Sequence, residues 1–201
     1  MLTIGVTGGI GSGKSTVTRF LEELDAPIID ADKVGHAIYA PDGPAYSDVV
    51  AAFGRGIVAS DGTIDRKKLG PIVFADAGAL KRLNSIVHPK MFARMREMIE
   101  HLRAGGERNP IVVEAAILIE ANWQALFDEI WLVITSRELV VERIERDRGL
   151  KPEQTDARIR AQLPDEERQK HSTLVITNNG TLDELRETVT HLWQAALVRN
   201  S

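Results

Sequence analysis

The glycine-rich segment near the N-terminus constrains the fold more than any other part of the chain. Residues 8–15 read GGIGSGKS and fit the pattern G-x-x-x-x-G-K-[ST] without a gap. A short apolar, β-branched run from Leu2 to Val6 precedes this segment, and a helical pattern that includes Phe20 and Leu21 follows it. The sequence therefore predicts a strand, a phosphate-binding loop and a helix, in that order.

The predicted loop has the residue types that bind nucleotide phosphates. Glycines allow consecutive backbone N–H groups to point into one concavity, and the N-terminus of the next helix adds partial positive charge. We expect Lys14 to reach the β- and γ-phosphates of ATP and the Ser15 hydroxyl to be a ligand of Mg²⁺. The alternative is a glycine-rich turn that binds nothing, but the flanking strand and helix favour phosphate binding. The expected ATP-binding residues of the loop are Gly8, Gly9, Ile10, Gly11, Ser12, Gly13, Lys14, Ser15 and Thr16.

Short apolar runs alternate with helical patterns along the rest of the chain. Further strands are expected at residues 27–29, 111–114, 129–134 and 173–177. This alternation predicts an α/β fold, namely a three-layer α/β/α core of the P-loop type with a mostly parallel sheet. Ligands of such sheets bind at the carboxyl ends of the strands.

The core is expected to carry two helical additions. Residues 1–33, 107–141 and 171–201 are assigned to the nucleotide-binding core. Residues 34–106 have few strand signals and are interpreted as a helical insertion, with separate helical stretches at 80–86 and 92–102. Residues 142–170 are arginine-rich and interrupted at Gly149 and Pro152, which indicates a mobile helical lid.

Two aspartates follow the second predicted strand. If the segment is extended, Asp30 and Asp32 point the same way, so one carboxylate can organise Mg²⁺ and the other can accept a hydroxyl proton. We choose Asp32 as the base and Asp30 as the metal-organising group. The alternative is that both aspartates cap the following helix, whose pattern begins near Lys33.

Four basic side chains are candidates outside the loop. Arg143 and Arg146 share a helical face and can supply guanidinium groups to a transferring phosphoryl group; the alternative is a solvated face paired with neighbouring acids. His88 can contact an acceptor, but a histidine before proline is more often a turn or helix-end residue. Arg66, near the turn at Asp61 and Gly62, can likewise either contact an acceptor or have only a structural role.

Composition excludes several other chemistries. The 201-residue chain has no cysteine, so disulfides and thiolate sites are excluded, and any metal must bind oxygen or imidazole. Its formal net charge of −4 does not favour nucleic-acid or anionic-membrane binding. We find no signal peptide and no long apolar run, and expect a cytoplasmic protein of unassigned oligomeric state.

Several motifs, in order, resemble the dephospho-CoA kinase family along almost the whole chain. They are TGGIGSGKS at residues 7–15, IDAD at 29–32, D-G-x-I-D-R-x-x-L at 61–69, L-N-x-I-x-H-P at 83–89 and V-I-x-N-x-G at 175–180. Residues 116–120 read AILIE, where that family usually has P-L-L-[FY]-E. The motifs after the phosphate loop are more specific than the loop itself, which many P-loop proteins share.

The resemblance implies an enzyme that transfers the ATP γ-phosphate to the ribose 3′-hydroxyl of dephospho-CoA, giving CoA and ADP. It implies that Asp32 is the general base, that Arg143 and Arg146 are lid arginines, and that Asn178 and Gly180 lie near the adenine. Arg66 and His88, with Asp32, would lie toward the acceptor, and 34–106 would bind it.

Two other functions remain possible from the residues alone. One is a P-loop kinase of another alcohol or nucleotide, because the loop and an acidic residue after the second strand do not name the acceptor. The other is a nucleotide-gated switch protein, which would need a partner and an exposed apolar patch.

Overall fold

A computed structural model of the chain describes residues 1–200, and it contains two compact units. The first unit comprises Met1–Asp30 together with the chain from Ile99 onward, and the second comprises Ala31–Met98. The finer division into core, acceptor-binding insertion and lid stays a prediction.

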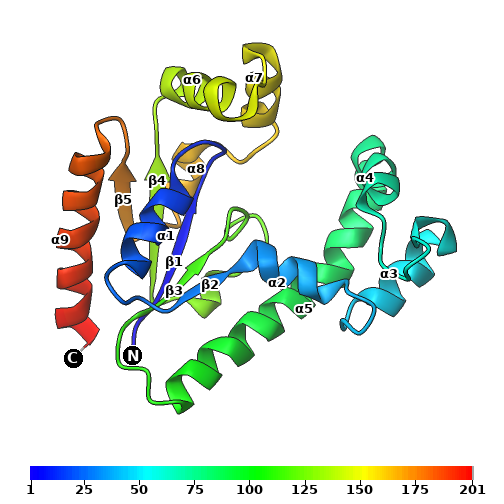
Figure 1. The fold of residues 1–201 in the computed structure, drawn as a ribbon, viewed down its shortest axis with the longest axis horizontal. Helices are drawn as coiled ribbons and strands as arrows, with labels where there is room; N and C mark the ends of the chain where they lie inside the picture. Colours follow the sequence, from blue (N-terminus) through cyan, green and yellow to red (C-terminus); the bar gives the residue numbers. More distant parts are fainter. Residues whose placement is uncertain (201) are drawn as a thin grey trace. The chain divides into compact units, whose positions relative to one another are not determined.

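The first unit is built on a five-stranded sheet in the order β2-β3-β1-β4-β5, with every neighbouring pair parallel (Figure 1). This confirms the predicted α/β fold, and the observed strand ends differ from the expected ones by at most two residues. Strand β1 lies at the centre and is buried along its whole length, because it is covered on both faces. The strands are β1 (Thr3–Gly8), β2 (Ile28–Asp30), β3 (Ile111–Glu114), β4 (Glu129–Ile134) and β5 (Leu174–Thr177).

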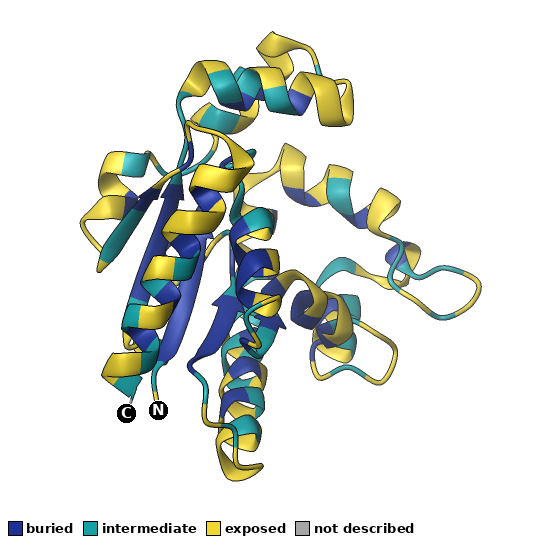
Figure 2. Ribbon diagram, turned by 60° about the vertical axis from the view of Figure 1, so that its left-hand side comes forward, coloured by how far each residue is buried: buried dark blue, intermediate teal, exposed yellow. Residues whose placement is uncertain are grey.

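Five α-helices lie wholly within the described part of the first unit, residues 1–30 and 99–200. Helices α1 and α9 pack against the same face of the sheet, where they bury large apolar side chains against β1 and β4 (Figures 1 and 2). In α9 the buried residues Leu185, Val189 and Trp193 are four apart and therefore form one stripe. Each fully buried side chain of this size contributes roughly 1.5–3 kcal/mol. The helices are α1 (Lys14–Glu22), α6 (Arg137–Arg148), α7 (Pro152–Arg160), α8 (Asp165–Gln169) and α9 (Leu182–Asn200).

The second unit is helical. It contains α2 (Ala31–Ile38), α3 (Tyr46–Phe53), α4 (Arg66–Ala75) and most of α5 (Ala77–Ala104). Lys90 links α5 to α3 and to the segment before it. Its ammonium group lies 2.7 Å from a carboxylate oxygen of Asp48 on α3 and donates to the Pro44 carbonyl at 2.8 Å. Among residues 1–200, no helix is both long and apolar enough to cross a membrane.

The alternative that His88 and Pro89 form a turn or a helix end is wrong, because both residues lie inside the continuous helix α5. An internal proline removes one backbone hydrogen bond and normally disfavours a helix by about 3 kcal/mol. Here the buried side chains of Leu83, Val87 and Met91 are four apart and continue the same stripe across the proline. Tertiary burial on both sides therefore outweighs the local penalty.

The assumption of an extended Asp30–Asp32 segment is also wrong. Asp30 ends β2, but α2 begins at Ala31, so Asp32 is its second residue. The alternation of side chains in a strand therefore stops at Asp30. Asp32 lies in the first helical turn, where a negative charge is favoured by the helix dipole, rather than before the helix as a cap.

Candidate active site

The phosphate loop connects β1 to α1 at the carboxyl edge of the sheet. The Lys14 ammonium group donates to the carbonyl oxygens of Gly8 and Gly9, at 2.9 Å each, and so folds back over the start of its own loop. Helix α1 begins at Lys14, and its first backbone N–H groups point toward the loop as in any helix start. This arrangement concentrates positive charge where a phosphate group would enter.

A polar cluster behind the loop fixes its last turn. The Ser12 carbonyl accepts hydrogen bonds from the Asn178 side-chain amide at 2.8 Å and from the Thr135 hydroxyl at 2.9 Å. Asn178 is buried, and its amide nitrogen would lie only 2.2 Å from a Cβ built on Gly13. Gly13 has φ +96°, in the left-handed region, so both its conformation and its surroundings require glycine.

Arg143 belongs to this cluster, whereas Arg146 does not. The Arg143 guanidinium donates to the Asn178 carbonyl at 3.1 Å and to the Thr135 hydroxyl at 3.4 Å, so α6 places it next to the residues that hold the loop. The Arg146 side chain is 66% exposed and pairs with Asp147, which raises the pKa of Arg146 and lowers that of Asp147. The structure thus assigns the two expected lid arginines different surroundings.

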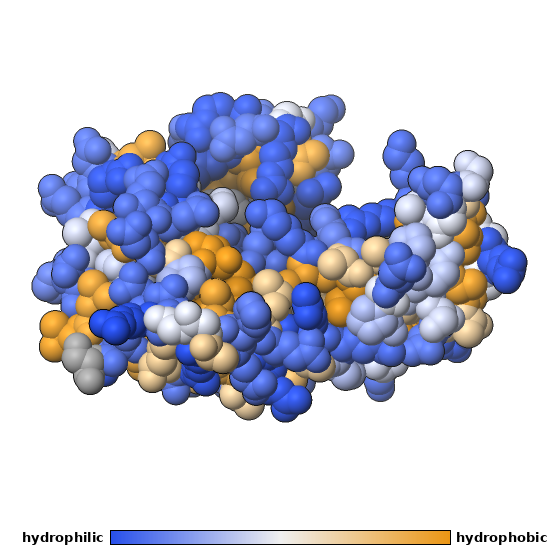
Figure 3. Space-filling view, turned by 60° about the horizontal axis from the view of Figure 1, so that its bottom comes forward, coloured by the Kyte–Doolittle hydropathy of each residue, from blue (hydrophilic) through white to orange (hydrophobic). Residues whose placement is uncertain are grey.

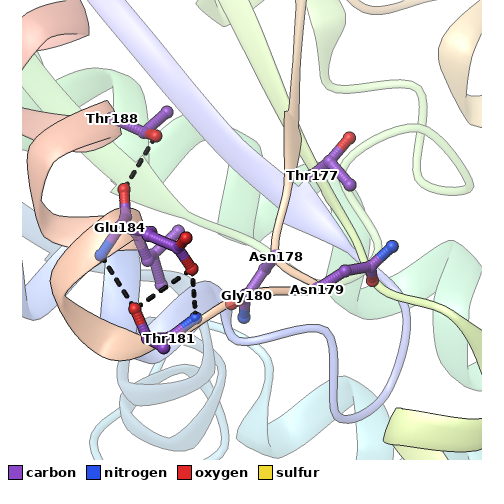
Figure 4. A pocket seen from close by; sticks show the side chains of 8 residues that line it. Thr177, Asn178, Asn179, Gly180, Thr181, Glu184 and Thr188 are labelled. Atoms are coloured by element: carbon purple, nitrogen blue, oxygen red, sulfur yellow. Dashed lines mark hydrogen bonds between the residues drawn. The ribbon is translucent and has the colours of Figure 1, made fainter.

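A cavity of about 280 Å³ lies beside this cluster, where β5 turns into α9 (Figure 4). Its lining includes Asn178 and Gly180, the two residues that the resemblance placed near the adenine. Thr181 and Glu184 form a reciprocal cap at the start of α9, with the Thr181 N–H donating to the Glu184 carboxylate at 2.7 Å. This hydrogen bond lowers the pKa of Glu184.

Two carboxylates sit at neighbouring strand ends. Asp30 is paired in register with Glu114, the last residue of β3, and β3 is the direct neighbour of β1. Glu114 accepts a 2.6 Å hydrogen bond from the hydroxyl of Thr18, one turn after Ser15 on α1. Sequence reasoning missed Glu114, although an acidic residue that ends a buried apolar strand is a recognisable signal.

Arg66 in the second unit is held by His36, which was not among the site residues expected from the sequence. The Asp65 side chain caps α4, which makes Arg66 the first residue of that helix. The Arg66 guanidinium lies 2.6 Å from His36 Nε2 on α2, and because a guanidinium can only donate, the ring nitrogen accepts this hydrogen bond. Burial raises the pKa of the nearby Tyr39 hydroxyl, and the positive charge of Arg66 partly opposes that shift.

His88 lies in the middle of α5, where it is half-buried. Burial lowers the pKa of its imidazole, because the charged form is disfavoured away from water. His88 is therefore neutral at pH 7, and a neutral imidazole can both donate and accept a hydrogen bond.

Among residues 1–200, the large apolar side chains that are exposed lie on several different elements. Ile72 and Phe74 are on α4, whereas Leu182 and Val198 are at opposite ends of α9. Hydrophilic residues predominate on the face shown in Figure 3.

The family model and two of the most similar relatives found all have the same name. The family model described as dephospho-CoA kinase matches residues 2–184. The chain is 44% identical to a dephospho-CoA kinase of Geobacter sulfurreducens over 96% of this chain and 98% of the relative. It is also 44% identical to that of Carboxydothermus hydrogenoformans, over 95% and 92% of the two chains.

Solved structures give the same result for the fold. Dephospho-CoA kinase from Campylobacter jejuni is 27% identical, with a TM-score of 0.75 over 99% of this chain and 98% of that one. Shikimate kinase from Acinetobacter baumannii, with a TM-score of 0.55 at 18% identity over 99% and 94% of the two chains, shares the fold alone. The match of motifs, full-length relatives and fold leads to one conclusion: the chain belongs to the dephospho-CoA kinase family.

Proposed function

We propose that the protein transfers the γ-phosphoryl group of ATP to the ribose 3′-hydroxyl of dephospho-CoA, giving CoA and ADP in the cytoplasm. In this reaction the bond between the γ-phosphorus and its bridging oxygen breaks, a new P–O bond forms to the 3′-oxygen, and the hydroxyl proton leaves. The observation that carries the proposal is a complete phosphate loop in a chain whose family match extends over residues 2–184.

Lys14 would stabilise the negative charge of the transferring phosphoryl group. Its ammonium is held by the Gly8 and Gly9 carbonyls at the mouth of the loop, which restricts its motion before ATP arrives. Arg143 would add a second positive charge from the lid, since its contacts with Asn178 and Thr135 place it at the loop. Arg146 would have to leave Asp147 to contribute directly.

Asp32 is our proposed general base. It lies in the first turn of α2 and is exposed, so its carboxylate is accessible to an incoming acceptor. Phosphoryl transfer to an alcohol needs a base within hydrogen-bond reach of the hydroxyl proton. The proton would pass from the 3′-oxygen to this carboxylate and then to water.

The residues at the strand ends suit Mg²⁺, which prefers oxygen ligands and is commonly held by one or two carboxylates and substrate phosphates. Ser15 and Asp30 would hold the ion directly or through water. Glu114, oriented by Thr18, would supply a second carboxylate next to Asp30. Bound Mg²⁺ would neutralise charge on the β- and γ-phosphates.

The second unit would bind the acceptor. Arg66, oriented by His36, is suited to an anionic group such as a phosphate of dephospho-CoA, because a guanidinium can donate two parallel hydrogen bonds. His88 would serve as a neutral hydrogen-bonding group on the same side. On the nucleotide side, Asn178 and Gly180 would lie near the adenine, next to the cavity at β5.

The test compares ADP release from ATP and Mg²⁺ with and without dephospho-CoA in the wild type and in Asp32→Asn. We expect acceptor-dependent release that falls by about 10²–10⁴-fold in the variant, the usual contribution of a positioned base. Asp42→Asn, at an exposed aspartate of the same unit, is the control for loss of one surface charge. Release that ignores dephospho-CoA would refute the substrate, and an active Asp32→Asn would refute the base.

A further inference from the structure

The segment between α7 and α8 contacts the phosphate loop from outside the nucleotide-binding motif. The side-chain oxygen of Gln162 accepts a hydrogen bond from the backbone N–H of Ile10 at 2.8 Å. A Cβ built on Gly9 would lie 3.6 Å from this same oxygen, so Gln162 is in contact with the Gly9–Ile10 link. Gln162 and the loop both belong to the first unit.

Gln162 and Lys14 form hydrogen bonds with the two polar atoms of one peptide group, the peptide that links Gly9 to Ile10. The carbonyl of Gly9 accepts from Lys14 at 2.9 Å, and the N–H that follows it, on Ile10, donates to Gln162. A trans peptide is planar, and its C=O and N–H point in opposite directions. Two hydrogen bonds from opposite sides therefore fix its rotation, which in turn keeps the Gly9 oxygen directed at Lys14.

Arg168 fixes the position of the segment that carries Gln162. Its side chain is only 1% exposed, and its two terminal nitrogens donate to Glu120, which follows β3, and to Asp165 at the start of α8, at 2.9 and 3.0 Å. The Nε atom of Arg168 is buried and has no hydrogen-bond partner among residues 1–200. A Cβ built on Gly9 would lie 3.4 Å from Arg168 Nη1, so the guanidinium also abuts the loop.

Burying a charged side chain is costly, and a buried ion pair contributes little net stability. Stability alone therefore does not explain why Arg168 is buried. The geometry here links three segments: the chain after β3, the start of α8 and the phosphate loop. A guanidinium suits this task better than an ammonium, because its fixed fork donates in two directions at once.

We propose that Gln162 is a positioning residue for nucleotide binding, which sets the Gly9–Ile10 peptide so that Lys14 is anchored, and that Arg168 positions Gln162. The proposal deepens the proposed function and rests on it only for the binding of nucleotide phosphates by the loop. The proposal does not depend on which acceptor the enzyme phosphorylates.

The test measures ADP affinity by calorimetry, with Gln162→Met as the main variant. Methionine is close in size to glutamine but cannot accept the Ile10 hydrogen bond well. Gln194→Met, at an exposed position on α9, is the matched control. We expect Gln162→Met to weaken ADP binding by about tenfold, in line with the loss of one hydrogen bond and a less rigid loop, and the control to match the wild type.

A purely structural role would give a different pattern. Under the proposal, Gln162→Met raises KM for ATP, leaves KM for dephospho-CoA unchanged and keeps Tm of the ligand-free protein near that of the wild type. Unchanged ADP affinity, or an equal rise in both KM values together with a large fall in Tm, would overturn it.

Arg168→Lys keeps the positive charge but loses the two-directional donation, so it should weaken ADP binding by a smaller factor than Gln162→Met does. Unchanged affinity in this variant would remove Arg168 from the proposal.

ADP binding is measured without any acceptor, so these results are distinguishable from a failure of the proposed function. If dephospho-CoA is not the acceptor, turnover with it is absent in the wild type, while the effect of Gln162 on ADP affinity persists.

Discussion

Replacing Gly13 by alanine should destabilise the protein more than the same change at Gly106, although both glycines have left-handed backbones. Their φ angles are +96° and +87°. Holding alanine in this region costs about 1–2 kcal/mol at either position. The change in unfolded-chain entropy is also the same, because both variants are glycine to alanine.

The difference lies in what the new methyl group meets. At Gly106 nothing lies within 4 Å of a built Cβ, whereas at Gly13 the side-chain nitrogen of Asn178 is 2.2 Å away. Asn178 must move, and its buried hydrogen bond to the Ser12 carbonyl is lost. Leaving such buried groups unpaired costs about 1–3 kcal/mol. We therefore expect a total of about 2–5 kcal/mol for Gly13→Ala, and about 1–2 kcal/mol for Gly106→Ala.

Urea unfolding, followed by tryptophan fluorescence, measures both values. Trp131 and Trp193 are buried in the first unit, so their emission reports its unfolding. Equal destabilisation by the two alanines would refute the claim that Asn178 packs against the loop. The double variant Gly13→Ala with Asn178→Ala should cost less than the sum of the single variants, because the second change removes the clash.

Three further predictions concern residues around the site. Thr18→Val removes the 2.6 Å hydrogen bond to Glu114, so the Mg²⁺ concentration for half-maximal activity should rise about fivefold with KM for dephospho-CoA unchanged. His36→Ala frees Arg66, so KM for dephospho-CoA should rise about fivefold while ADP affinity stays constant; equal effects on both would contradict this role. The pKa of His88 is lowered from 6.5 by burial, so as the pH falls below 6.5 the unfolded chain gains the proton before the folded chain does, and stability falls. His88→Gln should therefore lose less stability than the wild type between about pH 7.5 and 5, as measured by urea unfolding.

The core of the fold could be predicted because its signals are local. Short β-branched runs ended by polar residues indicate buried parallel strands, and all five are confirmed. The phosphate loop was equally predictable, because its glycines, Lys14 and the flanking elements are contiguous in sequence.

The errors arose where tertiary contacts outweigh local preference. Proline usually ends a helix, yet Pro89 lies inside α5 because the buried stripe continues past it. Helix α2 begins at Ala31, two residues before Lys33 where its pattern begins, and helix ends are the least certain feature of any sequence pattern.

Several contacts of the site join residues that are distant in sequence. Ser12 and Asn178 are 166 positions apart, and Ile10 and Gln162 are 152 apart. Neither glutamine nor asparagine carries a pattern that marks such a partner in a single sequence. Only the folded chain brings these residues together, so Gln162 could not have been found from the sequence.

The most direct test of the central claim is the identity of the product formed from ATP, Mg²⁺ and dephospho-CoA. Mass spectrometry and ³¹P NMR should show one phosphate added to dephospho-CoA, as a monoester on the ribose 3′-oxygen, with one ADP released for each CoA formed. A phosphate on a different oxygen, or ADP release without a phosphorylated acceptor, would contradict the account.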